Sequence, residues 1–115
     1  MHELGMCEPL VQAVTARADG RRVTGIGVRV GSRHRVDPAA FEMAFTLAAE
    51  GTVAEGATME LIDEPAQLRC NQCEAEGEWS VALALCPSCG SADVAISGGD
   101  ELVLEWITMA PAGER

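Results

Sequence analysis

The sequence predicts an α+β fold, in which a small sheet with two helices is joined to a module built around four cysteines. Three observations support this prediction. Two C-x-x-C pairs lie between positions 70 and 89. Apolar residues recur at helical spacing over residues 4–18 and 38–50, and the segments 23–30, 58–70 and 102–109 have the composition of strands. We expect residues 1–66 together with 98–115 to form the α/β domain, and 67–97 the cysteine module.

The cysteine pairs are the strongest signal in the chain. Cys70 and Cys73 form the first pair, and Cys86 and Cys89 follow after twelve intervening residues. The two residues inside each pair let the backbone curl, so that amide N–H groups point at the sulfurs. Four thiolates can fill a closed tetrahedral zinc site, which predicts a zinc ribbon-like four-cysteine module with no open position for catalysis. Two disulfides or unrelated core cysteines are the alternatives, and the duplicated spacing favours metal.

Charge and composition narrow the classes of partner. Eighteen acidic residues against eight basic ones give a net charge of −10. Such a surface repels the phosphates of nucleic acids and anionic membranes, so neither is an expected partner. Protein partners and metal cations fit it better. Neither a signal-peptide pattern nor an apolar run of membrane-spanning length is found, and the expected compartment is therefore the cytoplasm.

Two segments have the apolar periodicity of helices. The first helix is expected over residues 4–18, ending at Asp19-Gly20, with one apolar stripe of Leu4, Cys7, Leu10, Val11, Val14 and Ala18. On this stripe Cys7 is interpreted as a small buried side chain rather than a fifth metal ligand or a redox thiol. The second helix has Asp37 as its N-cap and Pro38 at its first position, and its expected apolar face is Phe41, Ala44, Phe45 and Ala48.

The remaining apolar segments predict strands. In the strand over 23–30, Gly25 and Gly27 share one face and would let a neighbouring element approach closely. The segment 58–70 is expected to be extended, with an edge or bend at Pro65. Residues 31–35 are expected to form a loop, in which His34 is only a weak candidate ligand.

Three further predictions concern the module and the strand after it. The alternation of Trp79, Val81, Leu83 and Leu85 predicts a strand between the cysteine pairs. Residues 97–100 are expected to form a hairpin turn. The segment 102–109 is apolar at both parities, which predicts a strand that returns to the first sheet and is covered on both sides.

The first three residues offer a second kind of metal chemistry. The α-amine of Met1, with an unperturbed pKa of about 7.7–8.0, can bind a metal together with the His2 imidazole and adjacent backbone amide nitrogens. Nitrogen-rich, roughly square-planar sites suit Ni(II) and Cu(II). On spacing alone this is a weak signal, because most histidines at position two of a chain have no such role.

Several motifs, taken in order, resemble one family along essentially the whole chain. They are Met1-His2-Glu3-Leu4, Val36-Asp37-Pro38, the segment 52–57 before a strand, the two C-x-x-C pairs, and residues 97–102. In this order they are similar to the nickel metallochaperones of hydrogenase maturation, the HypA/HybF family. One departure is that Trp79 lies further from the first pair than the aromatic residue usual in the family.

The resemblance implies a function and two metals. It implies nickel bound at Met1, His2 and Glu3, with Asp37 a minor candidate, and structural zinc held by Cys70, Cys73, Cys86 and Cys89. It further implies that nickel, as cargo, is handed over with a GTPase of the nickel-insertion pathway to the large subunit of a [NiFe] hydrogenase. Some relatives also serve urease, which adds urease accessory proteins to the implied partners.

Other classes of function remain as alternatives. A zinc-ribbon interaction module would use the four cysteines in the same way, although the acidic charge argues against nucleic acid as its target. The segment Cys86-Pro87-Ser88-Cys89-Gly90 also resembles a rubredoxin knuckle, so iron and electron transfer form a second alternative. No catalytic set of residues is visible, and we expect the chain not to be an enzyme.

Overall fold

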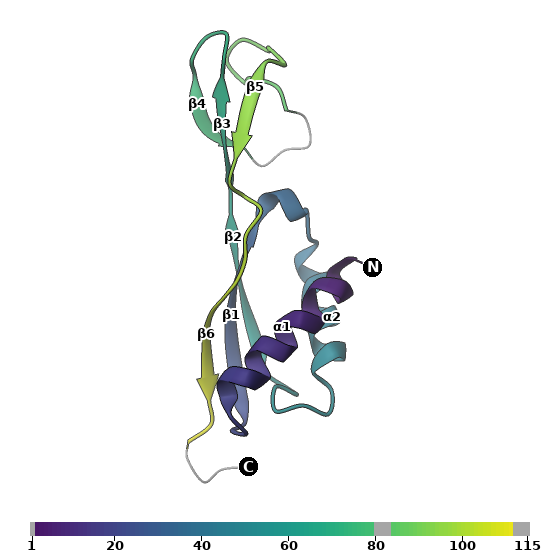
Figure 1. The fold of residues 1–115 in the computed structure, drawn as a ribbon. Helices are drawn as coiled ribbons and strands as arrows, with labels where there is room; N and C mark the ends of the chain where they lie inside the picture. The colour runs from purple at the N-terminus through teal and green to yellow at the C-terminus, as the bar shows by residue number, and fades with distance from the viewer. Residues whose placement is uncertain (1, 80–83, 112–115) are drawn as a thin grey trace. The chain divides into compact units, whose positions relative to one another are not determined.

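The computed structural model describes residues 2–79 and 84–111, with side chains from Glu3 onward. Its helices are α1 (His2–Ala18), the short 3-10 helix η1 (Ser32–His34) and α2 (Pro38–Ala49). Its strands are β1 (Val23–Gly31), β2 (Thr58–Glu64), β3 (Ala66–Cys70), β4 (Glu76–Trp79), β5 (Val94–Ser97) and β6 (Leu102–Met109). They form two three-stranded sheets, of order β2-β1-β6 and β4-β3-β5 (Figure 1). The predicted α+β class is confirmed.

Internal contacts divide the chain into two compact units. The first comprises Met1–Arg29, Val36–Ile62 and Val103–Arg115, and the second comprises Val30–Arg35 and Asp63–Leu102. All four clustered cysteines belong to the second unit. Among the residues that the structure describes, no helix is long and apolar enough to cross a membrane.

The core of the first unit lies where α1 and α2 pack side by side (Figure 1). The Asp37 carboxylate accepts a hydrogen bond from the Ala39 N–H at 3.2 Å, which confirms the predicted N-cap of α2. Phe41 and Phe45 are buried as predicted, but Ala49 completes the buried face and Ala48 is only half-buried. The buried face therefore follows the four-residue step from Phe41 through Phe45.

Cys7 lies inside this helix pair. Its side chain is fully buried, and its Sγ donates to the Phe41 carbonyl at 3.6 Å. Burial, with a smaller contribution from the Glu3 carboxylate, raises the pKa of Cys7 to about 11. The prediction of a small buried side chain is confirmed.

In the first sheet, Gly27 is covered by an aromatic ring. A Cβ at this position would lie 2.3 Å from the Trp106 ring, so the predicted close approach to a glycine is confirmed. The prediction that the last strand is covered on both sides is wrong. Leu104 is buried, but Glu105 and Trp106 are exposed, because the Trp106 ring lies over Gly27 of β1 and the residue remains 40% exposed to solvent.

In the second unit, β3 is the central strand of an antiparallel sheet. Leu68 lies opposite Gly77 of β4 and Ile96 of β5. The predicted strand between the cysteine pairs is present in part, since β4 includes Trp79, but it begins earlier, at Glu76, and Leu85 lies outside any strand. Val81 and Leu83 lie outside the described residues.

Residues 97–100 do not form the predicted hairpin turn. A hairpin requires β5 and β6 to pair with each other, whereas β5 pairs with β3 and β6 with β1. Instead, the connection binds the segment around η1, which the sequence predicted as a loop. The Gly31 N–H donates to the Glu101 carbonyl and the Arg33 N–H to the Gly99 carbonyl, both at 2.8 Å.

Gly31, the last residue of β1, lies against this connection and leaves no room for a side chain. A Cβ there would lie 2.0 Å from the backbone carbonyl oxygen of Gly99, which cannot move away as a side chain could. We expect Gly31→Ala to lower the free energy of unfolding by about 3 kcal/mol, measured by urea denaturation. The control is Gly77→Ala in β4, where nothing lies within 4 Å of the added Cβ. Equal stability of the two variants would contradict this prediction.

Candidate metal centre

The four cysteines of the C-x-x-C pairs come together at one end of the second unit. Their sulfurs all lie within 4.8 Å of one another, with Cys70–Cys89 and Cys73–Cys86 separated by 3.6 Å each. A tetrahedral zinc ion with bonds of about 2.3 Å requires sulfur separations of about 3.8 Å. A disulfide requires about 2.05 Å, and these cysteines are free. The cluster therefore has the dimensions of a metal site with four thiolate ligands.

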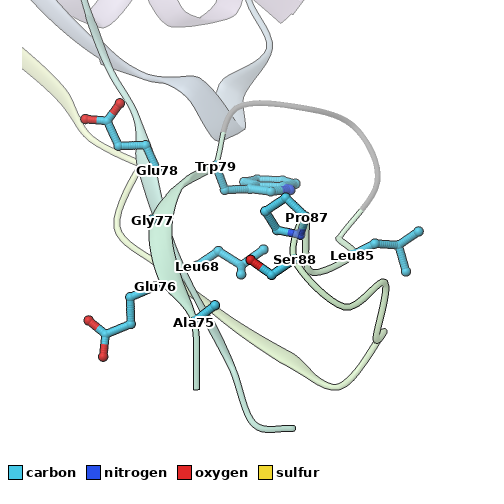
Figure 2. Close-up of a pocket in the computed structure, with 9 residues that line it drawn as sticks. All are labelled: Leu68, Ala75, Glu76, Gly77, Glu78, Trp79, Leu85, Pro87 and Ser88. Atoms are coloured by element: carbon cyan, nitrogen blue, oxygen red, sulfur yellow. The ribbon is translucent and has the colours of Figure 1, made fainter. Parts of the chain in front are cut away.

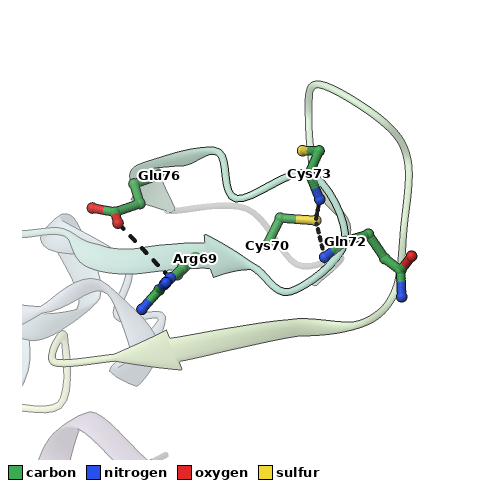
Figure 3. Close-up of polar contacts among 5 residues, drawn as sticks. All are labelled: Arg69, Cys70, Gln72, Cys73 and Glu76. Carbon is green, nitrogen blue, oxygen red and sulfur yellow. Dashed lines mark hydrogen bonds and ion pairs between the residues drawn. The ribbon is translucent and has the colours of Figure 1, made fainter.

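The first knuckle, Cys70–Cys73, connects β3 to β4. Backbone N–H groups of Gln72 and Cys73 donate to the Cys70 Sγ at 3.3 and 3.4 Å (Figure 3). The turn is closed by the Cys70 N–H, which donates to the Ala75 carbonyl, and the Glu74 N–H, which donates to the Cys70 carbonyl. Both the curl of the backbone and the N–H···S bonds agree with the prediction from spacing.

The second knuckle, Cys86–Cys89, repeats this pattern of hydrogen bonds. The Ser88 and Cys89 N–H groups donate to the Cys86 Sγ at 3.4 Å each. The Cys86 N–H donates to the Ser91 carbonyl, and the Gly90 N–H to the Cys86 carbonyl. The two knuckles thus have the same hydrogen bonds at equivalent positions.

One pair of equivalent positions differs in residue type. Glu74 has φ +64° and Gly90 has φ +77°, so both knuckles end in the left-handed conformation that favours glycine. We expect Glu74→Gly to raise the free energy of unfolding by roughly 0.5–1 kcal/mol, and Gly90→Ala to lower it by roughly 1 kcal/mol. Denaturation of the zinc-loaded variants measures both. A decrease for Glu74→Gly would show that its side chain outweighs the backbone strain.

The four thiols differ in exposure and in acidity. Cys70 and Cys86 are buried, whereas Cys73 and Cys89 are exposed. Hydrogen bonds from the Cys89 and Ser88 N–H groups lower the pKa of Cys86 to about 6, and those from Cys73 and Gln72 lower the pKa of Cys70.

The two exposed thiols shift the other way. The Ala75 N–H lowers the pKa of Cys73, but the Cys86 thiol, burial and the Cys70 thiol together raise it. The Ser91 N–H likewise lowers the pKa of Cys89, but the Cys70 thiol, burial and the other thiols raise it to about 12. Four adjacent thiolates repel one another, so full ionisation of this cluster requires a cation. A divalent metal fits this set of donors.

Asp93 lies beside the first knuckle, and sequence analysis missed it. Its carboxylate accepts from the Asn71 Nδ2 at 3.0 Å and the Gln72 Nε2 at 3.3 Å. These two side chains lower the pKa of Asp93. The signal in the sequence would have been an acid four residues after Cys89, matched to the amide side chains between Cys70 and Cys73.

A cavity of about 240 Å³ adjoins the second knuckle. Figure 2 shows Leu68, Trp79 and Pro87 directed into it, while Glu76 and Glu78 point away on the other side of β4. None of the four clustered cysteines is among the residues described in its lining. The cavity is therefore separate from the cysteine cluster.

The residues predicted to bind nickel are described only in part. Met1 lies outside the described residues, and His2 is the first residue of α1. Glu3 is only 9% exposed, and its Oε2 accepts a hydrogen bond from the Asp37 N–H at 3.4 Å. The structure therefore brings Glu3 to the start of α2, next to the minor candidate Asp37.

Comparison with known proteins identifies the family. The family model described as "Hydrogenase/urease nickel incorporation, metallochaperone, hypA" matches residues 1–109. A hydrogenase maturation factor HypA of Rhodobacter capsulatus is 36% identical, over 89% of this chain and 93% of the relative. A hydrogenase maturation factor HybF of Morganella morganii is 35% identical over the same shares.

The solved structures agree in fold. The solution structure of the Ni metallochaperone HypA from Helicobacter pylori superposes with a TM-score of 0.61 at 22% identity, covering 93% of this chain and 96% of that one. A further HypA solution structure has a TM-score of 0.55 at 23% identity, covering 93% and 92%.

These matches decide between the alternatives that the sequence left open. They favour the metallochaperone over a zinc-ribbon interaction module or a rubredoxin-like protein, because the matched region runs from the first residue through both knuckles. A maturation factor works with other maturation proteins. The resemblance seen in the sequence is confirmed: the chain belongs to the HypA family of nickel metallochaperones for hydrogenase maturation.

Proposed function

We propose that this chain binds Ni(II) at Met1, His2 and Glu3 and delivers it for the maturation of a [NiFe] hydrogenase. In the same proposal Cys70, Cys73, Cys86 and Cys89 hold one structural zinc ion. The observation that carries the proposal is the family match, which begins at residue 1 and spans both knuckles. The clustered thiols support the proposed zinc site.

The start of α1 supplies nitrogen donors for nickel. Because α1 begins at His2, the first backbone nitrogens lie at the end of the helix next to the α-amine, and they would bind Ni(II) after losing their protons. The Glu3 carboxylate accepts from the Asp37 N–H, so the donor we assign to Glu3 is its backbone nitrogen. With the α-amine of Met1 and the His2 imidazole, these atoms would form a nitrogen-rich set, which suits Ni(II).

The zinc site has a structural role in this proposal. Its four protein ligands would leave no coordination position for a substrate. When bound, zinc supplies the positive charge that lets all four thiols ionise, and with it much of the folding free energy of the module. The chain would bind and transfer metal without chemical turnover, and therefore would not be an enzyme.

The partners we propose are those of nickel insertion. They are the GTPase of that pathway, the large subunit of the [NiFe] hydrogenase and, where urease is served, urease accessory proteins. The acidic surface of the chain is compatible with protein partners and metal cations. The proposed compartment is the cytoplasm, where thiols stay reduced for zinc.

Metal analysis of the untagged protein tests this proposal. We expect mass spectrometry to find one zinc and one nickel per chain after nickel loading and desalting. His2→Ala should keep the zinc and lose the nickel. His34→Ala is the matched control, because it removes the other of the two histidines, and should keep both metals. Nickel retained by His2→Ala would contradict the proposed ligand set.

A further inference from the structure

We infer that Asp93 is a positioning residue that locks the first knuckle in its metal-binding conformation and thereby slows the release of zinc. The inference rests on the zinc site of the proposed function, but it concerns a side chain outside the four ligands. The supporting observations are the hydrogen bonds that connect Asp93 to both knuckles.

Toward the first knuckle, Asp93 holds both residues that lie between Cys70 and Cys73. Its carboxylate accepts from the Asn71 Nδ2 at 3.0 Å and the Gln72 Nε2 at 3.3 Å. Its backbone carbonyl accepts from the Asn71 N–H at 2.9 Å. These contacts fix the turn whose N–H groups, from Gln72 and Cys73, donate to the Cys70 Sγ.

Toward the second knuckle, Asp93 is connected through Ser91. The Asp93 N–H donates to the Ser91 Oγ at 3.0 Å, and the Ser91 carbonyl accepts from the Cys86 N–H at 2.9 Å. The next residue, Val94, begins β5 and lies opposite Cys70. Asp93 therefore joins the two knuckles through the protein itself, independently of the metal.

The two knuckles differ in how much support their sequences require. Pro87 follows the first cysteine of the second knuckle, and its ring fixes φ of that turn. Asn71 and Gln72 provide no such constraint, so side-chain hydrogen bonds supplement the backbone hydrogen bonds of the first knuckle. In metal sites, partners of this kind outside the ligand set typically change metal affinity by about 10–100-fold.

An exchange of the acid and the amide tests this role. Asp93→Asn places an amide where Gln72 donates, and Gln72→Glu places a second carboxylate beside Asp93. The double variant restores one carboxylate and one amide with their positions exchanged. The full-length, zinc-loaded protein is mixed with an excess of a chromogenic chelator, and the rate of zinc transfer is measured. The control is Glu78→Gln in β4, which makes the same change of charge with a side chain that points away from the cavity beside the second knuckle.

We expect each single variant to release zinc about 10–100-fold faster than the wild type, the double variant to return to within about threefold, and Glu78→Gln to match the wild type. If Asp93→Asn purifies without zinc while the double variant retains it, the inference is also supported. Wild-type rates in Asp93→Asn, or no recovery in the double variant, would overturn it. Wild-type protein that holds no zinc at all would instead overturn the zinc site of the proposed function, and the inference with it.

Discussion

Acetylation of the Met1 α-amine is expected to abolish tight Ni(II) binding while leaving the fold and the zinc content unchanged. Acetylation converts the amine into an amide and leaves every side chain in place. A nickel site built from side chains elsewhere in the chain would not respond to it. Isothermal titration of the acetylated and native proteins with Ni(II) measures the difference, and we expect no tight binding to the acetylated form because an amine ligand is lost.

An N-terminal tag of many residues is a second form of the same change. It should lose nickel to the same degree, since the new amine then lies far along the chain from the His2 imidazole. Equal affinity in the native and acetylated proteins would show that the site is not at Met1, and the functional assignment would then rest on the family match alone.

Acidification should weaken this nickel site. The α-amine and the imidazole bind metal only when deprotonated, and their unperturbed pKa values are about 7.7–8.0 and 6.5. Apparent affinity is therefore expected to fall from about pH 8 downward, and more steeply below about pH 6.5, because protons then compete at both groups. Titrations at several pH values measure this slope.

Replacing Cys73 by Ser is expected to release the zinc and unfold residues 70–96, while α1 and α2 partly persist. Structural zinc sites contribute about 10–16 kcal/mol of apparent binding free energy, which exceeds what a small module can recover from its own core. Apart from Leu68, few apolar residues of β3, β4 and β5 are buried in the described part of the second unit. Metal analysis together with circular dichroism measures both effects. Full zinc occupancy in Cys73→Ser would refute the four-cysteine site.

Cys7→Ser is the matched control for this variant. Cys7 is buried between α1 and α2 and belongs to the other unit. The Cys7→Ser variant should keep the same zinc content as the wild type, and it should lower only the stability of the helices. Zinc loss in Cys7→Ser would contradict its assignment as a structural side chain.

Zinc binding should release at least two protons at pH 7. The pKa of Cys73 is raised and that of Cys89 is about 12, so both thiols carry protons at this pH in the absence of metal. Zinc affinity should therefore fall as pH decreases, because protons compete with the metal for the thiolates. Calorimetry in buffers of different ionisation enthalpy counts the protons.

Much of the metal site follows from local sequence alone. The two-residue spacing within each cysteine pair dictates a turn whose N–H groups reach the first sulfur, and both knuckles form it. The cap at Asp37 is equally local, since it depends on a side chain and its own helix, and the buried position of Cys7 follows from the apolar stripe of its helix. Such features depend on neighbours a few residues away, which are visible in the sequence.

Other features depend on which distant segments pair, and only the tertiary structure decided them. Residues 97–100 have the composition of a hairpin turn, but β5 pairs with β3 and β6 with β1. The apolar pattern of 102–109 is that of a buried strand, yet β6 is at an edge and exposes Trp106. Asp93 joins the metal site through Asn71 and Gln72, more than twenty residues earlier in the chain. Strand partners and contacts of this kind are selected by the free energy of the whole packed arrangement, which no short stretch of sequence contains.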